Sequence, residues 1–192
     1  MLKKIKKIRE LTGNGMVDIK KALEEAQGDE AEAIKILRKK GKEKASKKAQ
    51  RSTQEGVVVS YIHSNNRVGA MVKLLCETDF VARNEEFKQL AKDIAMHITA
   101  MNPTCVKPEE ITDKMVEEEK EIWKEQYKDE KKPAELIANI LKGKEKKFRQ
   151  EQALLTQAFV KNPEQTVGDL IADKIGKIGE NIQVGDFTRL EL

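Results

Sequence analysis

The chain is poor in the residues on which disulfide-rich domains and many metal sites depend. Its 192 residues include two cysteines, two histidines and four prolines, and only 4% are aromatic. Cys76 and Cys105 form no CxxC pair and lie far apart in the sequence, so we expect reduced thiols rather than a disulfide framework. The lack of closely spaced cysteine and histidine also argues against a zinc site.

Long apolar runs and nucleotide-binding loops are missing too. No stretch approaches the ~20 apolar residues of a membrane-spanning helix, and the lysines at the start lead into no hydrophobic secretory core. We therefore expect a cytoplasmic protein without membrane contact. There is no GxxxxGK[ST] motif, and Gly13-Asn14-Gly15 lacks the third glycine and the preceding strand of a dinucleotide-binding loop.

Charge is abundant and unevenly distributed. Charged residues make up 36% of the chain and apolar residues 39%, a composition that favours a folded, mostly helical protein. Residues 1–51 carry 16 Lys and Arg against 8 Asp and Glu, so that segment has a net charge of +8 and the rest −4. A basic front end is typical of contact with RNA or with an acidic protein surface, and equally of lysine-rich helices in solvent.

The apolar spacing predicts three short helices in the first 41 residues. The first ends at Thr12-Gly13-Asn14-Gly15, the second ends at Gly28, and the third is capped by Asp29 and stops at Gly41. We interpret residues 1–41 as a separate three-helix domain. A lysine-rich helical linker is expected over residues 42–55.

From Gly56 the apolar period changes to two, which predicts a core domain over residues 56–192. Strands 57–62 and 68–77 should form a hairpin, and a helix capped by Asn84 and ended by Asn102-Pro103 should cover it. The fold class is therefore α+β, with a small three-helix bundle and a helix-rich core that contains a three-stranded antiparallel sheet.

The rest of the core is expected to supply a helical hairpin and the third strand. Helices over about 113–130 and 133–152 should pack as an antiparallel pair across Lys131-Lys132-Pro133. The apolar residues of the first segment are Val116, Ile122, Trp123 and Tyr127. A last helix should begin after Thr166. Residues 182–192 then read as a closing strand.

The stretch between strand 68–77 and Asn84 is unusual because it places Phe80 at a corner. Two readings remain open from the residues alone: Phe80 folds back to staple the start of the next helix, or its ring is presented to a partner. Asp79 either caps the following turn or contacts that partner. Cys76 fits a small core residue, although a thiol enzyme built on it is a rival reading.

Two segments resemble the elongation factor Ts family. Residues 78–84, directly after an apolar strand, resemble the family's signature, and residues 8–23 are similar to its ubiquitin-associated-like N-terminal domain. Segments 132–148 and 157–160 extend the resemblance over nearly the whole chain. Two positions depart from it: Val17 stands where the family often has a second methionine, and Gly185-Asp186 where a basic pair is common.

The resemblance implies a nucleotide exchange factor for the GTPase elongation factor Tu rather than an enzyme, with no metal and no cofactor. In the family, the bundle and the core grip the GTPase, and an Asp-Phe corner inserts near its bound magnesium and phosphates. The implied exchange wedge consists of Thr78, Asp79, Phe80, Val81, Arg83 and Asn84. The implied docking residues of the bundle are Leu11, Gly15, Met16 and Val17.

The resemblance also implies a homodimer, because longer family members carry two core half-domains and this chain, by its length, supplies one. The closing strand, with Phe187 and Leu190, is the candidate interface. No direct contact with nucleic acid is expected. The alternative function is a basic RNA-binding accessory protein of translation.

Overall fold

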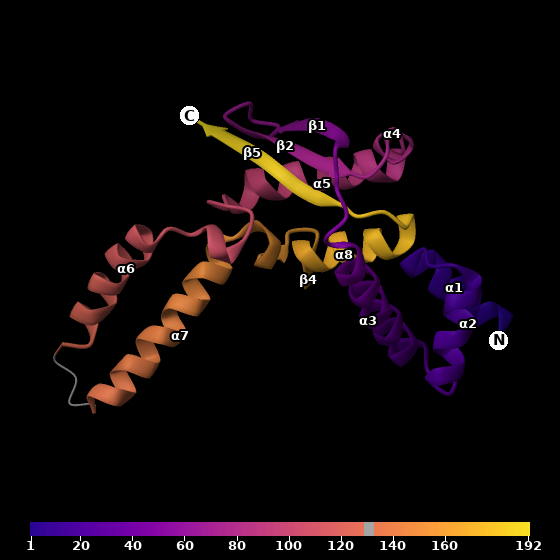
Figure 1. Ribbon diagram of the computed structural model, residues 1–192, viewed down its shortest axis with the longest axis horizontal. Helices are drawn as coiled ribbons and strands as arrows, with labels where there is room; N and C mark the ends of the chain where they lie inside the picture. The colour runs from indigo at the N-terminus through magenta and orange to yellow at the C-terminus, as the bar shows by residue number, and fades with distance from the viewer. Residues whose placement is uncertain (129–132) are drawn as a thin grey trace. The chain divides into compact units, whose positions relative to one another are not determined.

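The computed structural model describes residues 1–128 and 133–192 and shows the expected mixture of helices and strands (Figure 1). The helices are α1 (Leu2–Thr12), α2 (Met16–Glu25), α3 (Glu30–Lys48), α4 (Asp79–Ala82), α5 (Glu85–Met101), α6 (Asp113–Gln126), α7 (Ala134–Gln152) and α8 (Val167–Ile178). The strands are β1 (Glu55–Ile62), β2 (Val68–Cys76), β3 (Ala158–Phe159), β4 (Asn162–Thr166) and β5 (Gln183–Glu191). Short 3-10 helices occupy Pro108–Glu110 and Leu154–Thr156.

The chain divides into two compact units, each assembled from several parts of the sequence. The first unit comprises residues 1–59, 73–92 and 169–185, and the second comprises residues 60–72, 93–168 and 186–192. The first unit therefore holds the N-terminal helices together with the end of β2 and the corner that follows it. The second holds the helical hairpin and the turn between β1 and β2.

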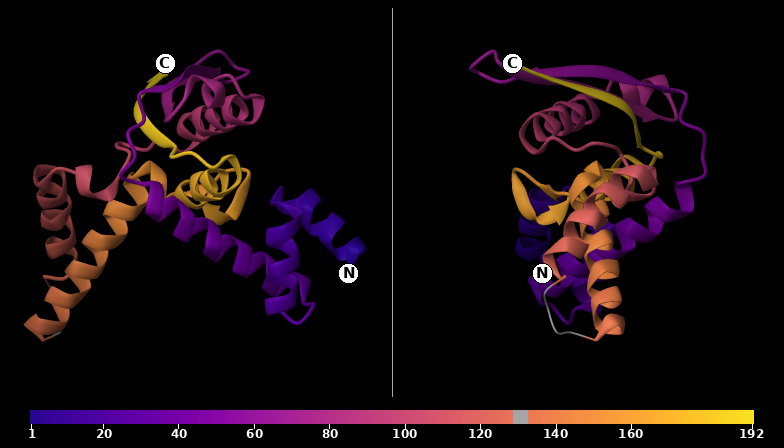
Figure 2. Two further views of the ribbon diagram at one scale, coloured as in Figure 1. Left: turned by 45° about the vertical axis from the view of Figure 1, so that its right-hand side comes forward. Right: turned by 90° about the vertical axis from the view of Figure 1, so that its left-hand side faces the viewer.

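Three helices form the N-terminal bundle, as the apolar spacing predicts (Figure 2). Their shared core contains Ile8, Ile19 and Leu23, all almost completely buried. Gly13 ends α1 in the left-handed region, with φ 67°, and its N–H donates to the carbonyl of Arg9. The bundle is thus closed by local turn chemistry and a few large aliphatic side chains.

The third helix was expected to stop at Gly41, but α3 continues to Lys48. A Cβ atom added to Gly176 of α8 would lie 3.2 Å from the Cα atom of Gly41, so the missing side chains let α3 and α8 approach closely. Lys42 adds an ion pair to Asp169 at 2.7 Å. Gly41 therefore serves helix packing, and the predicted helical linker is helical only as far as Lys48.

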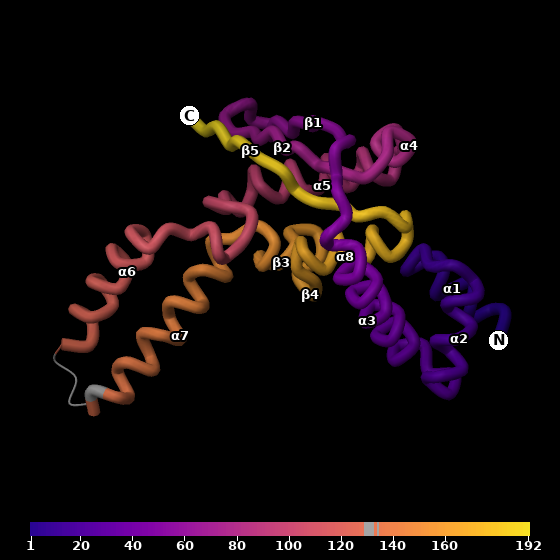
Figure 3. The backbone as a smooth tube through the Cα atoms, viewed as in Figure 1, coloured from indigo at the N-terminus to yellow at the C-terminus, as the bar shows by residue number. Residues whose placement is uncertain are grey.

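The three-stranded sheet has the order β1-β2-β5, which confirms the predicted closing strand (Figure 3). Alternate residues of β2 are buried, among them Val72, Leu74 and Cys76. Helix α5 begins after Asn84, whose side chain accepts the N–H of Glu86 at 2.7 Å, so the predicted cap is confirmed. Its apolar face is fully buried and contains Phe87, Leu90, Ala91, Ile94, Ala95 and Ile98.

Helices α6 and α7 pack as the predicted antiparallel pair (Figure 1). The ring of Trp123 meets Phe148 edge-on, with centroids 5.9 Å apart, and Lys120 pairs with Glu145 at 2.6 Å. Ile122, another apolar residue of α6, is exposed. The predicted turn at Lys131-Lys132 lies outside the described residues.

The short β3–β4 hairpin was not predicted. Phe159 pairs with Asn162 in the register of these two strands, and β3 has only two residues, too few to show a periodic pattern. Along the described residues, no helix is both long enough and apolar enough to cross a membrane.

Candidate functional site

The candidate wedge is a corner between the sheet and α5. Strand β2 ends at Cys76, and the single-turn helix α4 begins at Asp79. Thr78 is the N-cap of α4, since its hydroxyl accepts the N–H of Val81 at 3.4 Å. The capping role considered for Asp79 therefore belongs to Thr78, and the sequence predicted the turn but not its helical form.

Phe80 stands out from this corner. Its side chain is 81% exposed, which contradicts the reading in which it staples the start of α5. Asp79 forms an ion pair with Arg83 at 3.0 Å, one helical turn away, while Val81 is partly covered and Ala82 is buried. The structure therefore brings the predicted wedge residues together on one short turn, with Phe80 at the position most open to a partner.

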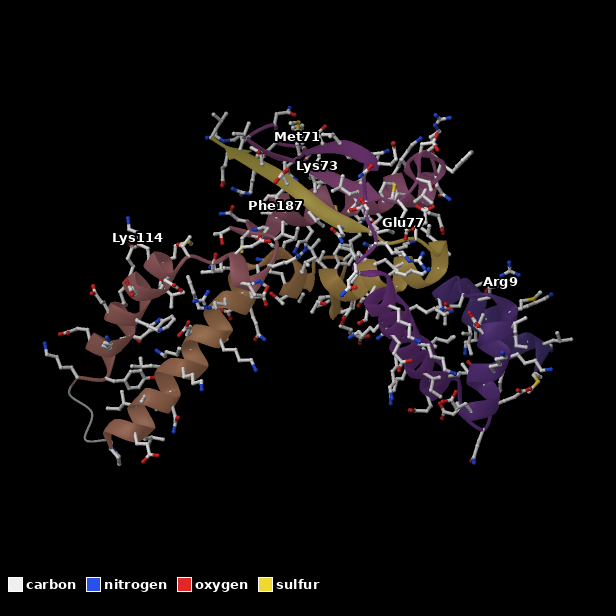
Figure 4. All side chains as sticks on the ribbon, in the orientation of Figure 1. Arg9, Met71, Lys73, Glu77, Lys114 and Phe187 are labelled. Atoms are coloured by element: carbon white, nitrogen blue, oxygen red, sulfur yellow. The ribbon has the colours of Figure 1, made fainter. Side chains whose placement is uncertain are left out.

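The corner is held by hydrogen bonds to residues that were not predicted as part of the site: Glu77, Glu180 and Asn181. The carboxylate of Glu180 accepts hydrogen bonds from the N–H of Glu77 at 3.1 Å, the N–H of Thr78 at 3.0 Å and the hydroxyl of Thr78 at 2.7 Å. In return, the N–H of Asn181 donates to the carboxylate of Glu77 at 2.6 Å. We call these four residues the clasp; Figure 4 labels Glu77 at the end of β2.

The clasp carries no local sequence signal. Its partners are 102 to 104 positions apart, and a glutamate and an asparagine after a helix are ordinary turn residues. The one hint is Gly179, which has φ 91° and ends α8 directly before Glu180. Only the tertiary fold places that turn against the end of β2.

The predicted docking residues of the bundle are also exposed. Leu11, Met16 and Val17 are 68%, 56% and 67% exposed, and Gly15 is the N-cap residue of α2 with extended backbone. Met16 is not part of the buried core of the bundle. Three apolar side chains at a helix junction therefore remain open to solvent.

Lys177 of α8 lies beside residues that flank the two candidate sites. Its ammonium group pairs with Glu86 at the start of α5, and its side chain fills the space beside Gly13, in the loop that precedes Gly15. The hydrogen bond from Lys177 lowers the pKa of Glu86, against the opposing effect of burial. The start of α5 and the loop between α1 and α2 thus share one cation.

Cys76 does not have the environment of a nucleophile. It is fully buried, its thiol donates to the carbonyl of Thr78 at 3.2 Å, and burial raises its pKa to about 11. A reactive cysteine needs the opposite shift, because the thiolate is the attacking species. The thiol-enzyme reading is therefore wrong, and Cys76 is the small core residue that its strand position predicts.

The described residues offer no metal site, and several lysines of the basic front end are paired. Among residues 1–128 and 133–192, no group of three or more His, Cys, Asp or Glu side chains could hold a metal ion. Within the bundle, Lys7 pairs with Glu30 and Lys40 with Glu25, each at 2.5 Å. Part of the basic excess is therefore neutralised within the bundle itself.

Comparison with known proteins gives one consistent family. The family model described as Elongation factor TS matches residues 2–192. A curated protein from Fervidobacterium nodosum named Elongation factor Ts is 51% identical over 188 residues, which cover 98% of this chain and 95% of the relative. Proteins of the same name from Thermosipho melanesiensis (50% over 187 residues, 97% of this chain and 95% of the relative) and Rubrobacter xylanophilus (46% over 191 residues, 100% and 98%) are also similar.

Proposed function

Since the chain belongs to the elongation factor Ts family and is thereby a translation elongation factor, we propose that it binds the GTPase elongation factor Tu and accelerates the release of GDP. The observation that carries this proposal is the exposed Phe80 on a corner fixed by the clasp. Because the backbone that carries the ring is already ordered before binding, the ring loses little conformational freedom when it enters a partner's pocket.

The acceleration follows from binding alone. Suppose that this chain binds nucleotide-free elongation factor Tu more tightly than the GDP-bound form. The chain then lowers the affinity of the GTPase for GDP by the same factor by which GDP lowers its affinity for the chain. The wedge accounts for this difference in affinity between the two forms when Phe80 stabilises a GTPase conformation whose phosphate and magnesium contacts are distorted. No bond is made or broken, so the chain acts as an exchange factor rather than as an enzyme, and it needs no cofactor of its own.

The reciprocal effect of GDP tests this proposal. The affinity of the chain for nucleotide-free elongation factor Tu should be measured by titration calorimetry and then repeated with saturating GDP. A large loss of affinity in GDP is expected. Equal affinity in both states would contradict the exchange function, because a ligand that binds two states equally shifts neither.

The N-terminal bundle is proposed as a second docking surface for the same GTPase. Its exposed Leu11, Met16 and Val17 form an apolar surface at the start of α2. Met16→Asp in the full chain should weaken complex formation by about tenfold, which corresponds to about 1.4 kcal/mol, without unfolding the bundle, because Met16 is outside its core. An unchanged dissociation constant would remove this surface from the interface.

A homodimer is proposed through the outer face of the sheet. Exposed Ile62, Met71, Leu190 and Leu192 line an apolar depression of about 600 Å³ there. Phe187 was expected to share the interface with Leu190, but side chains alternate along a strand, and Phe187 faces the same side as Arg189, which donates to the carbonyl of Thr99 on α5 at 3.0 Å. The interface therefore uses Leu190 and not Phe187.

Sedimentation equilibrium tests the dimer. A mass of roughly twice the 21.8 kDa of the chain is expected at micromolar concentration, and Met71→Lys should shift it towards the monomer. The control is Ile122→Lys, which adds the same charge on an exposed position of α6. A wild-type mass near 22 kDa would contradict the proposal.

The cellular setting follows from the partner. We place the protein in the cytoplasm and expect no direct contact with nucleic acid, because the proposed surfaces are apolar. The RNA-binding alternative predicts affinity for RNA that falls steeply with salt and needs no GTPase. A filter-binding assay with RNA at two salt concentrations separates the two functions.

A further inference from the structure

We propose that Glu180 is a positioning residue for nucleotide exchange, acting through the corner on Phe80. This inference rests on the proposed function and assigns a role in it to a residue outside the predicted wedge. All three hydrogen bonds from the corner to the Glu180 carboxylate come from Glu77 and Thr78, the two residues that precede α4. The carboxylate therefore fixes the backbone from which the wedge starts.

Helix α4 has little stability of its own. It is a single turn of four residues, and a helix of that length does not persist without support because its nucleation is costly. Its N-cap is Thr78, whose hydroxyl accepts the N–H of Val81 while it donates to Glu180. Glu180 therefore fixes the rotamer of the residue that caps the turn.

The ring of Phe80 is covered by little of the surrounding protein. Because Phe80 is 81% exposed, the direction of its ring depends mainly on the φ and ψ angles of α4. When Glu180 is removed, Thr78 is free to leave the cap and the ring samples more directions before binding. The conformational entropy of the ring is then lost on binding rather than on folding, which weakens its contact with the partner.

Glu180 is itself held in place by its neighbours. Asn181 is buried, with 1% of its surface exposed; its N–H donates to Glu77 and its side-chain amide donates to the carbonyl of Arg51 at 2.8 Å. Lys48, the last residue of α3, donates to the carbonyl of Gly179. The turn that carries Glu180 is therefore anchored to the segment after α3, which gives the carboxylate a fixed position.

A double-mutant cycle tests the role. Glu180→Ala, Phe80→Ala and the double variant are compared with the wild type in stopped-flow release of fluorescent GDP from elongation factor Tu. Glu180→Ala should slow the accelerated release by about three- to tenfold. The double variant should be no slower than Phe80→Ala alone, because a residue that acts only through Phe80 has nothing left to position.

Two further substitutions separate positioning from folding. Glu180→Gln keeps a carbonyl oxygen that can accept both backbone N–H groups, and its NH2 group can donate to the Thr78 hydroxyl in place of the acceptor oxygen, so it should restore most of the exchange. Glu110→Ala is the matched control, because the Glu110 carboxylate accepts two consecutive backbone N–H groups, of Val106 at 2.9 Å and Lys107 at 3.1 Å, in the other compact unit. It should lower stability without changing exchange per folded molecule.

Each outcome decides the proposal. The positioning role is overturned, while the proposed function stands, if Glu180→Ala accelerates GDP release as well as the wild type does. It is also overturned if the reductions in release rate of the two single variants multiply in the double variant. A wild-type chain that does not accelerate GDP release would overturn the proposed function, and the positioning role would fall with it. If Glu180→Ala does not fold, Glu180→Asp takes its place in the cycle, because it keeps the charge but withdraws the carboxylate by one methylene, and the same loss is expected.

Discussion

Replacement of Phe80 by alanine distinguishes a role in exchange from a role in folding. Because the side chain is 81% exposed, about a fifth of the ~200 Å² that a phenylalanine can bury is covered, or ~40 Å². At about 25 cal/mol per Å², this covered area contributes at most about 1 kcal/mol to the free energy of unfolding. A phenylalanine packed in a core would lose about 3–5 kcal/mol in the same substitution.

The effect on exchange is expected to be larger than the effect on stability. Phe80→Ala should keep most of the affinity for the GTPase, since the bundle surface is intact, but should slow accelerated GDP release by about tenfold or more, a loss of about 1.4 kcal/mol of barrier reduction. Stopped-flow release at equal concentrations of folded protein and a circular-dichroism melt measure the two quantities separately. Ile122→Ala, which also removes an exposed apolar side chain, is the control. A lower melting temperature with unchanged exchange per folded molecule would refute the reasoning.

Three further predictions concern stability. Gly143→Ala on α7 should raise the free energy of unfolding by up to about 1 kcal/mol, because nothing lies within 4 Å of the added Cβ and alanine favours helix. Gly176→Ala should lower it in the same urea titration, because the added Cβ meets the backbone of Gly41 at 3.2 Å; equal effects of the two changes would contradict the close packing of α3 and α8. His97 is buried neutral, its Nδ1 accepting the N–H of Val160 at 3.2 Å, and burial lowers its pKa below the usual 6.5. Below pH 6.5 the unfolded chain therefore gains a proton that the folded chain does not, so stability should fall by up to about 1.4 kcal/mol per pH unit until the folded pKa is reached. His97→Gln should flatten the dependence of the free energy of unfolding on pH in this range. Parallel pH profiles of the wild type and the variant would contradict the prediction.

The parts of the fold that depend on local pattern could be predicted from the sequence. Asn84 caps α5 and the apolar alternation of β1 and β2 forms a hairpin, because caps and strand periods involve residues close together in the chain. Phe80 was singled out for the same reason, as an aromatic residue between a strand and a helix cap. The resemblance then implied which partner it would contact.

The errors arose where a tertiary contact decides the role of a residue. Gly41 looks like a helix stop until Gly176 is brought beside it, and Glu180 has no visible purpose until its turn meets the end of β2. Phe187 and Leu190 were grouped by hydrophobicity alone, although their odd spacing already places them on opposite faces of a strand. The clasp could not have been found without the structure, since no pattern links residues a hundred positions apart.

The proposed function requires this chain to speed the loss of GDP from elongation factor Tu. The most direct measurement is the rate at which fluorescent GDP leaves the GTPase when excess unlabelled GDP is added, with and without the wild-type chain. We expect a release rate that rises with the concentration of the chain and then saturates when all of the GTPase is bound. A release rate that stays the same at every concentration of the chain would contradict it.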